Sequence, residues 1–236
     1  MTFSRTFTRM IQVDRHTSMF DLFQALRDDS TPNTPAAFTE ALMPEIKQSF
    51  WLLVSSNTVI DSQDTQVLPM ILERAVPSGV SVALNVDWQP QLWGLPPHSP
   101  PSSEVLRRVQ PLIWAAQLIH CTGEEAEMFF GTTDPVRLHN GLPQRPAVLI
   151  MDSAGDLQWC IGGLRGRLDF SMLQDHEVFL ARLLDNLSTN PQLLGHAGPG
   201  VDAVADPDGL AEQLLTAAAA SAGPSLIHNK GLFIDH

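Results

Sequence analysis

The sequence predicts an α/β fold with a mainly parallel central sheet, because one stretch reads as strand, helix and strand in succession. Residues 49–55 (SFWLLVS) form a continuous apolar run, which is typical of a buried parallel strand. A helix capped by Ser62 or Asp64 and ending at Ala75 follows, with apolar side chains on one face. Residues 80–86 then alternate as in a second strand. Short turns join the three elements, as in the βαβ unit of a parallel sheet.

The rest of the chain supplies further elements of both kinds. A helix can begin at Thr34-Pro35 and run to Ile46, because proline is favoured in a first helical turn. GGLRGR (162–167) resembles a cationic hairpin turn, and residues 188–208, rich in Gly, Pro and Asp, predict a long surface loop. Downstream of residue 86 we expect strands at 117–121, 147–151 and 157–161, and helices at 104–114, 122–131, 174–187 and 210–222.

Composition favours one globular domain over residues 1–236. Hydrophobic residues make up 44% and charged residues 17%, which suffices for a sizeable core. The balance of 14 Lys and Arg against 26 Asp and Glu gives a net charge of −12, which disfavours nucleic acid and anionic membranes as partners. Cys121 and Cys160 lie in apolar settings and predict reduced thiols. We find neither a signal peptide nor an apolar run of membrane-spanning length, and therefore expect a cytoplasmic location.

The strand at 80–86 ends in polar residues that point to a binding crevice. Ligands of open α/β sheets sit at the carboxyl ends of the strands. Residues 81–93 (SVALNVDWQPQLW) resemble the D-V-N-W-R-P-x-L-W signature of fructokinase-like members of the pfkB (ribokinase-like) sugar kinase family. The residues that match are Trp88, Pro90, Leu92 and Trp93. The polar positions differ: the family's Asp, Asn and Arg are replaced by Asn85, Asp87 and Gln89.

A second resemblance concerns the phosphoryl-transfer site. Residues 170–184 (FSMLQDHEVFLARLL) resemble V-D-T-T-G-A-G-D-A-F-L-A-G-L-L, in which the G-A-G-D run begins a helix. In the family its backbone N–H groups hold the migrating phosphoryl charge and its Asp takes the proton of the sugar hydroxyl. Here the run is Gln174, Asp175, His176 and Glu177. Side chains replace both glycines and Asp175 adds repulsion, while Glu177 keeps a carboxylate at the base position. An ordinary helix N-terminus needs none of this chemistry, and the residues favour that reading.

Three further segments resemble the family's metal and nucleotide sites. Residues 122–131 (TGEEAEMFFG) resemble its N-x-x-E segment, in which Glu125 matches the metal-associated Glu and would help to place Mg²⁺. The alternative is a helix whose acidic first turn suits the helix dipole. Residues 149–157 (LIMDSAGDL) resemble V-T-L-G-x-K-G-A-L of the nucleotide pocket, with Asp152 in place of its first glycine and Gly155 retained. The alternative is a polar hairpin turn. Near the carboxyl end, Gly231 matches the glycine of T-T-T-K-x-G-A.

The resemblance implies a three-layer α/β/α ribokinase-like fold. The family's N-terminal portion has no counterpart in this sequence. Residues 5–13 and 16–23 look like two strands, and this predicted hairpin within residues 1–27 would be a remnant of the family's lid. Family membership implies transfer of the γ-phosphoryl of ATP to a sugar hydroxyl with Mg²⁺.

The altered motifs instead favour a pseudokinase, possessing little or no activity and no necessary cofactor. Such a protein would serve as a binding or assembly partner, and a homodimer mate or another protein would cover the edge left by the missing portion. The alternative is an active, fructokinase-like sugar kinase that uses Glu177 as its base.

Overall fold

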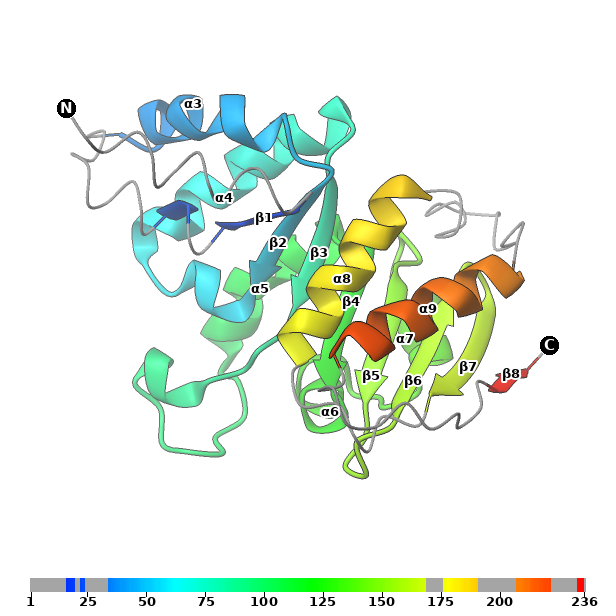
Figure 1. Cartoon of the computed structure of the whole chain (residues 1–236). Helices are drawn as coiled ribbons and strands as arrows, with labels where there is room; N and C mark the ends of the chain where they lie inside the picture. Colours follow the sequence, from blue (N-terminus) through cyan, green and yellow to red (C-terminus); the bar gives the residue numbers. More distant parts are fainter. Residues whose placement is uncertain are drawn as a thin grey trace.

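The computed structural model describes residues 16–19, 22–23, 34–168, 176–190, 207–221 and 233–235 (Figure 1). In this part of the chain eight strands form one sheet in sequence order. The first five are parallel, and the pairs beyond β5 are antiparallel. The strands are β1 (His16–Ser18), β2 (Trp51–Ser55), β3 (Ser81–Asn85), β4 (Leu118–Thr122), β5 (Ala147–Met151), β6 (Leu157–Ile161), β7 (Leu164–Leu168) and β8 (Phe233–Asp235).

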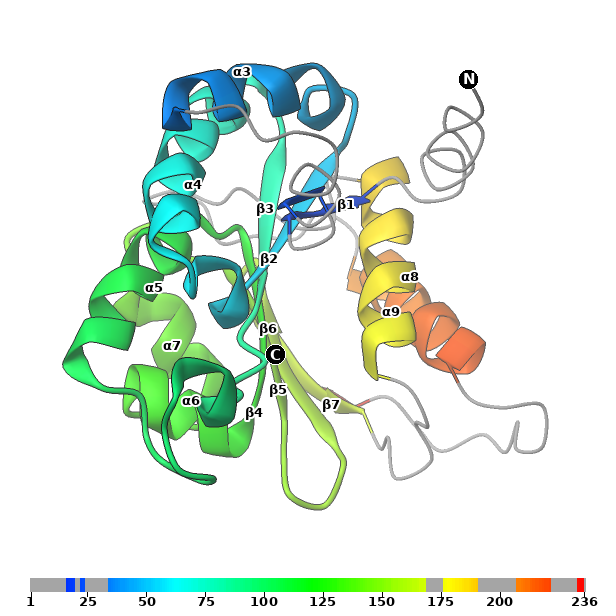
Figure 2. The ribbon, with the colours of Figure 1, turned by 90° about the vertical axis from the view of Figure 1, so that its left-hand side faces the viewer.

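Helices cover both faces of the sheet, which confirms the predicted three-layer α/β/α fold (Figure 2). One face carries α3 (Pro35–Ile46), α4 (Ser62–Ala75), α5 (Ser103–Ala115), α6 (Gly123–Phe130) and α7 (Pro135–Gly141). The other face carries α8 (His176–Thr189) and α9 (Pro207–Ser221), which pack against each other. Short 3₁₀ turns η1 (Ser56–Val59), η2 (Val76–Ser78) and η3 (Pro90–Trp93) follow β2, α4 and β3.

The predicted βαβ unit is confirmed as β2, α4 and β3, with one difference at the helix start. The cap is Asp61, whose carboxylate accepts a hydrogen bond from the Gln63 N–H at 2.8 Å, rather than Ser62 or Asp64. Asp64 is buried in the first turn instead. Pro69 lies within α4 without ending it.

Two apolar clusters form the core, one on each face of the sheet. Alternate residues of each strand face opposite sides, so that Leu84 joins the cluster under α3–α7 and Ala83 the cluster under α8 and α9. The predicted inward face of α8 is confirmed, because all its apolar members are buried: Phe179, Leu180, Leu183, Leu184 and Leu187. On the same side Trp159 of β6 is fully buried, and its cross-strand partner is Gly166, which has no side chain to compete for the space.

Two sequence interpretations are corrected at the ends of the sheet. The structure assigns His16–Ser18 to the central sheet, parallel to β2, and not to a separate hairpin lid over residues 16–23. Met19, Leu22 and Phe23 after it belong to the core. The expected partner strand at 5–13 lies outside the described residues. GGLRGR is also more than a turn: Gly162 and Gly163 make the turn, and the remaining residues form strand β7.

Within the described ranges, no helix is both long enough and apolar enough to cross a membrane. Cys121 and Cys160 are buried thiols, as expected from their apolar settings.

Candidate functional site

The carboxyl ends of the parallel strands meet at one edge of the sheet. The segments that leave this edge are η1 after β2, residues 86–93 after β3, α6 after β4 and the turn 152–156 after β5. Helix α8 begins on the same side (Figures 1 and 2). The topology therefore brings together, from the described residues, most of the segments that the sequence singled out.

Asp87 is held in a left-handed backbone conformation at the end of this strand, with a φ of 43°. Non-glycine residues rarely adopt this region, so its neighbours must hold it there. The Nδ2 of Asn57 donates to the main-chain oxygen of Asp87 at 2.9 Å and to its Oδ2 at 3.0 Å. The hydroxyl of Ser56 donates to the same main-chain oxygen at 3.2 Å. Because Asn57 is buried, η1 fixes Asp87 from the interior.

Gln89 folds back onto the same carboxylate. Its Nε2 lies 3.0 Å and 3.1 Å from the two carboxylate oxygens of Asp87. Both oxygens of Asp87 are thus occupied by amide donors of the chain itself. At position 89 the family signature has an arginine, which would bring a positive charge to this loop. In this chain the residue is Gln89, and no Lys or Arg of the described residues forms an ion pair with Asp87.

The matching aromatic residues form a scaffold beneath this loop. The Trp88 ring lies 5.6 Å from Phe129 in an edge-on arrangement and 6.1 Å from Trp93. Its indole Nε1 donates to the main-chain oxygen of Ser99 at 2.8 Å. The guanidinium of Arg108 lies 5.8 Å from the centre of the Trp93 ring. Trp88 therefore joins the loop to α6 and to the segment that precedes α5.

Glu125 closes the amino end of α6. Its Oε2 accepts bonds from the Thr122 N–H at 2.7 Å and the Thr122 hydroxyl at 3.0 Å, while the Glu125 N–H donates to that hydroxyl. This reciprocal arrangement is a capping box. The other oxygen, Oε1, accepts the Trp88 N–H at 2.6 Å. The contacts of Glu125 in the described residues are thus structural, and its expected role near Mg²⁺ stays a prediction.

Asp152 organises the turn between β5 and β6. Its Oδ1 accepts the N–H groups of Ala154 at 2.9 Å and Asp156 at 3.0 Å. Arg167 of β7 reaches back to the turn, with its Nε 2.9 Å from Oδ2 of Asp156 and its NH2 3.4 Å from Oδ2 of Asp152. Gly155 has a φ of 83°, which the turn requires. The segment is thus a polar turn between antiparallel strands, and the nucleotide-binding roles expected for Asp152 and Gly155 stay predictions.

The pKa of Asp152 lies below its ordinary value despite partial burial. Burial alone would raise this pKa, because it disfavours the charged form. The N–H groups of Asp156 and Ala154 oppose it by hydrogen bonding to the carboxylate. The side chains of Gln158 and Arg167 add to this stabilisation of the charge. Asp152 is therefore a fixed negative charge at the position where the family's nucleotide loop has a glycine.

A polar pair, of which His120 is buried, links β3 and β4 within the sheet. The Nδ1 of His120 on β4 lies 2.9 Å from Oδ1 of Asn85 on β3, its partner in register. Asn85 stands where the family signature has Asp. Its amide thus bonds to a neighbouring strand.

For the remaining predicted site residues the structure describes at most the backbone. Gln174, Asp175 and Gly231 lie outside the described residues. His176 and Glu177 are the first two residues of α8, which places their backbone at the carboxyl edge of the sheet; their side chains are not described. The expected roles of these residues stay predictions.

Sequence reasoning missed Asn57 and Arg167. Ser55-Ser56-Asn57-Thr58 directly follows the apolar run of β2, and a polar cluster at the end of a buried parallel strand is a usable signal for a site residue. Arg167 was missed because residues 162–167 were interpreted as a turn, whereas Arg167 belongs to strand β7. No group of three or more His, Cys, Asp or Glu able to hold a metal ion occurs in the parts of the chain that the structure describes.

Comparison with solved structures identifies the architecture. A fructokinase from Xylella fastidiosa superposes with a TM-score of 0.57 at 21% identity, over 75% of this chain and 54% of that one. The chain has the fold of the ribokinase-like, or pfkB, carbohydrate kinases. The same fructokinase with bound ATP gives a TM-score of 0.58 at 19% identity, over 80% of this chain and 56% of that one.

A third similar structure is an aminoimidazole riboside kinase from Salmonella enterica, complexed with aminoimidazole riboside and an ATP analog. It superposes with a TM-score of 0.52 at 17% identity, over 73% of this chain and 55% of that one. The chain thus spans little more than half the length of these ribokinase-like structures. By sequence, no protein-family model and no curated protein matches it.

Proposed function

We propose that this ribokinase-like protein has little or no phosphotransferase activity and acts as a binding or assembly partner. The observation that carries the proposal is the fixed Asp152 carboxylate in the β5–β6 turn. The relative with bound ATP is a fructokinase, and a kinase of this fold must hold a polyanion. A carboxylate about 4 Å from a phosphate charge costs about 4 kcal/mol at an effective dielectric constant of 20.

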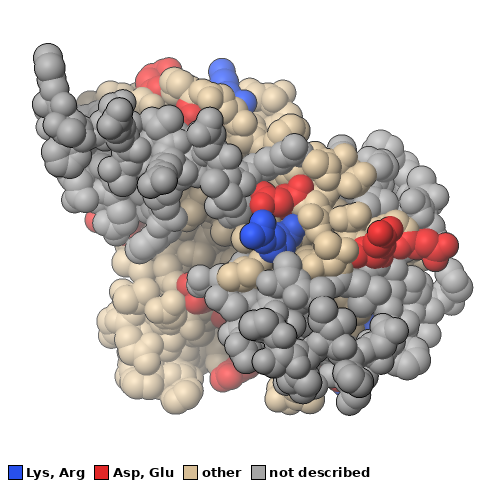
Figure 3. All heavy atoms as spheres, viewed as in Figure 1, with Lys and Arg blue, Asp and Glu red and all other residues tan. Residues whose placement is uncertain are grey.

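The loop after β3 supports the same proposal. Asp87 is paired with Asn57 and Gln89, so its polar groups are satisfied within the chain. Phosphoryl transfer needs positive charge or bare N–H groups directed at the phosphate. The described residues of this loop supply a second carboxylate instead. On the face drawn in Figure 3, acidic side chains appear at several places, and the largest basic group lies directly beside acidic atoms.

The order of strands in the sheet suggests an edge at which the proposed partner would bind. β1 is the outermost strand of the described sheet on its parallel side. We place at this edge the second copy, or other protein, that the sequence analysis expects. Sedimentation of the purified chain over a range of concentrations tests for the second copy, and a monomer at all concentrations would leave only another protein.

Calorimetric titration with Mg·ATP, with and without fructose, tests the proposal. For the folded protein we expect no saturable heat below about millimolar nucleotide, which corresponds to a binding free energy weaker than roughly −4 kcal/mol. Saturable binding that fructose strengthens, together with ADP production, would overturn it. Circular dichroism and a cooperative unfolding transition in the same sample would show that the protein is folded.

The second candidate is an active sugar kinase that uses Glu177 as base. It is favoured by the position of Glu177 in the first turn of α8, at the edge where a sugar hydroxyl would be activated. A kinase assay of Glu177→Gln distinguishes the two. Any measured activity that falls by about 100-fold or more in Glu177→Gln, but not in the exposed control Glu124→Gln, would support this alternative.

A further inference from the structure

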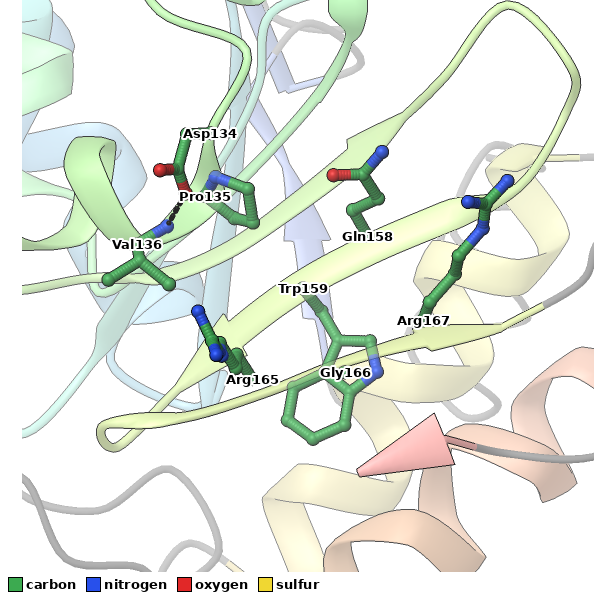
Figure 4. A pocket seen from close by; sticks show the side chains of 8 residues that line it. All are labelled: Asp134, Pro135, Val136, Gln158, Trp159, Arg165, Gly166 and Arg167. Atoms are coloured by element: carbon green, nitrogen blue, oxygen red, sulfur yellow. Dashed lines mark hydrogen bonds between the residues drawn. The ribbon is translucent and has the colours of Figure 1, made fainter. Parts of the chain in front are cut away.

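A cavity of about 310 Å³ lies on the face of the sheet that carries α7, away from α8. It is bounded by Asp134, Pro135 and Val136 at the start of α7 and by residues of β6 and β7 (Figure 4). Helix α7 packs on β5 and β6. The outer face of β7 is exposed at Arg165 and Arg167. The volume is at the lower end of the range for small-molecule sites.

The two arginines of this cavity differ in their contacts. They alternate along β7, so both side chains point to the same face. Arg167 is already paired with Asp156 and Asp152. Arg165 forms no ion pair among the described residues, and its side chain extends toward the α7 end of the cavity. Among the described side chains of the cavity, Arg165 is thus the cation without a carboxylate partner, and it can pair with a small anion.

Gln158 adds a neutral hydrogen-bond acceptor to the cavity that contains the Arg165 guanidinium. It faces the cavity from β6, and its side chain is among the groups that lower the pKa of Asp152, which fits an amide nitrogen directed toward that carboxylate. Figure 4 shows its side-chain oxygen turned the other way, toward Asp134. Asp134 itself caps α7, with one oxygen accepting the Val136 N–H at 2.9 Å. The cavity therefore offers a guanidinium at one side and a neutral acceptor at another.

We propose that this cavity binds a small hydroxycarboxylate. Its carboxylate would pair with the Arg165 fork, and its hydroxyl would donate to the Gln158 side-chain oxygen. The Asp134 carboxylate at the rim disfavours ligands of higher negative charge. The lining includes neither Asp152 nor Asp87, the residues on which the proposed function rests, so failure of one proposal does not decide the other.

NMR titration of the whole chain tests it, with lactate as the probe and propionate as the match that lacks the hydroxyl. We expect lactate to shift the amides of residues 158–167 saturably, with a dissociation constant near millimolar. Propionate should bind several-fold more weakly, since it lacks one hydrogen bond. Arg165→Met should weaken lactate binding by at least tenfold, whereas Arg107→Met, at an exposed arginine of α5, should leave it unchanged.

The proposal would be overturned by no saturable shift with lactate, by equal binding of propionate, or by unchanged lactate binding in Arg165→Met. Sulfate that shifts the same amides as strongly would also overturn it, by revealing a general anion site. If Arg165→Met does not fold, Arg165→Lys replaces it. The lysine keeps the charge but loses the two-pronged geometry, and should still weaken lactate binding several-fold.

Discussion

The side-chain nitrogen of Asn57 lies 2.9 Å from the main-chain oxygen of Asp87 and 3.0 Å from its carboxylate, and so links the ends of two neighbouring strands. Asn57→Ala removes both bonds from a buried position and leaves Asp87 in a left-handed conformation without this support. We expect a loss of about 1–3 kcal/mol in the free energy of unfolding, measured by urea denaturation. Asn140→Ala, at an exposed asparagine of α7, is the control and should change it by less than about 0.5 kcal/mol. Equal values for the two variants would contradict the role given to Asn57.

The parts of the fold that the sequence predicted are those that depend on residues close together in the chain. The central elements have strong periodic signals, and α3 begins at Pro35 and ends at Ile46 as its residues indicate. β7 was missed because LRGRL has a glycine and two arginines where strands usually have apolar or β-branched residues. It forms because Leu168 and the pairing with β6 hold it in the sheet.

In the candidate site, too, local contacts could be predicted from sequence and contacts between distant residues could not. The Thr122–Glu125 capping box is local and follows from residues three apart. The contacts of Asn57 with Asp87 and of Arg167 with Asp152 join residues 30 and 15 positions apart, which no local pattern records. The family resemblance singled out Asp87, Gln89 and Asp152 as candidate site residues, but the structure was needed to show which polar groups they contact.

Glu125 offers a second test, which separates a structural carboxylate from a metal-associated one. Glu125→Ala loses the capping box and the bond to the Trp88 N–H, so we expect a loss of about 1–2 kcal/mol in stability. The neighbouring Glu124→Ala removes an exposed carboxylate and should cost less than about 0.5 kcal/mol. Thermal unfolding with and without Mg²⁺ completes the measurement. A magnesium-dependent stabilisation present in the wild type and absent in Glu125→Ala would favour the metal role.

Asp152 predicts a pH dependence of stability. Its folded pKa is below the unfolded value of about 3.9, so the charged form stabilises the native state at higher pH. That contribution is present above about pH 5 and is lost as the pH falls through the folded pKa. Urea unfolding of the wild type and Asp152→Asn should therefore show the largest stability difference near neutral pH and a diminishing one toward pH 3. The exposed control Glu127→Gln should lack this pattern. A difference that is constant with pH would show that the charge of Asp152 is not what stabilises the turn.

Trp88 tests whether the matching residues of the signature act as a scaffold. Trp88→Phe removes the hydrogen bond to the Ser99 oxygen and reduces the contact area with Phe129 and Trp93. We expect a cost of about 1–2 kcal/mol and faster proteolysis of the loop at 94–101, since Ser99 loses its attachment. Trp114→Phe, at a tryptophan that is 51% exposed, should have little effect on either measurement. A fully stable Trp88→Phe with an unchanged loop would mean that the aromatic residues are not required for packing. The match of Trp88, Pro90 and Trp93 to the family signature would then need another explanation, namely contacts with a ligand at the same edge of the sheet. That result would favour the sugar kinase alternative over a purely structural role.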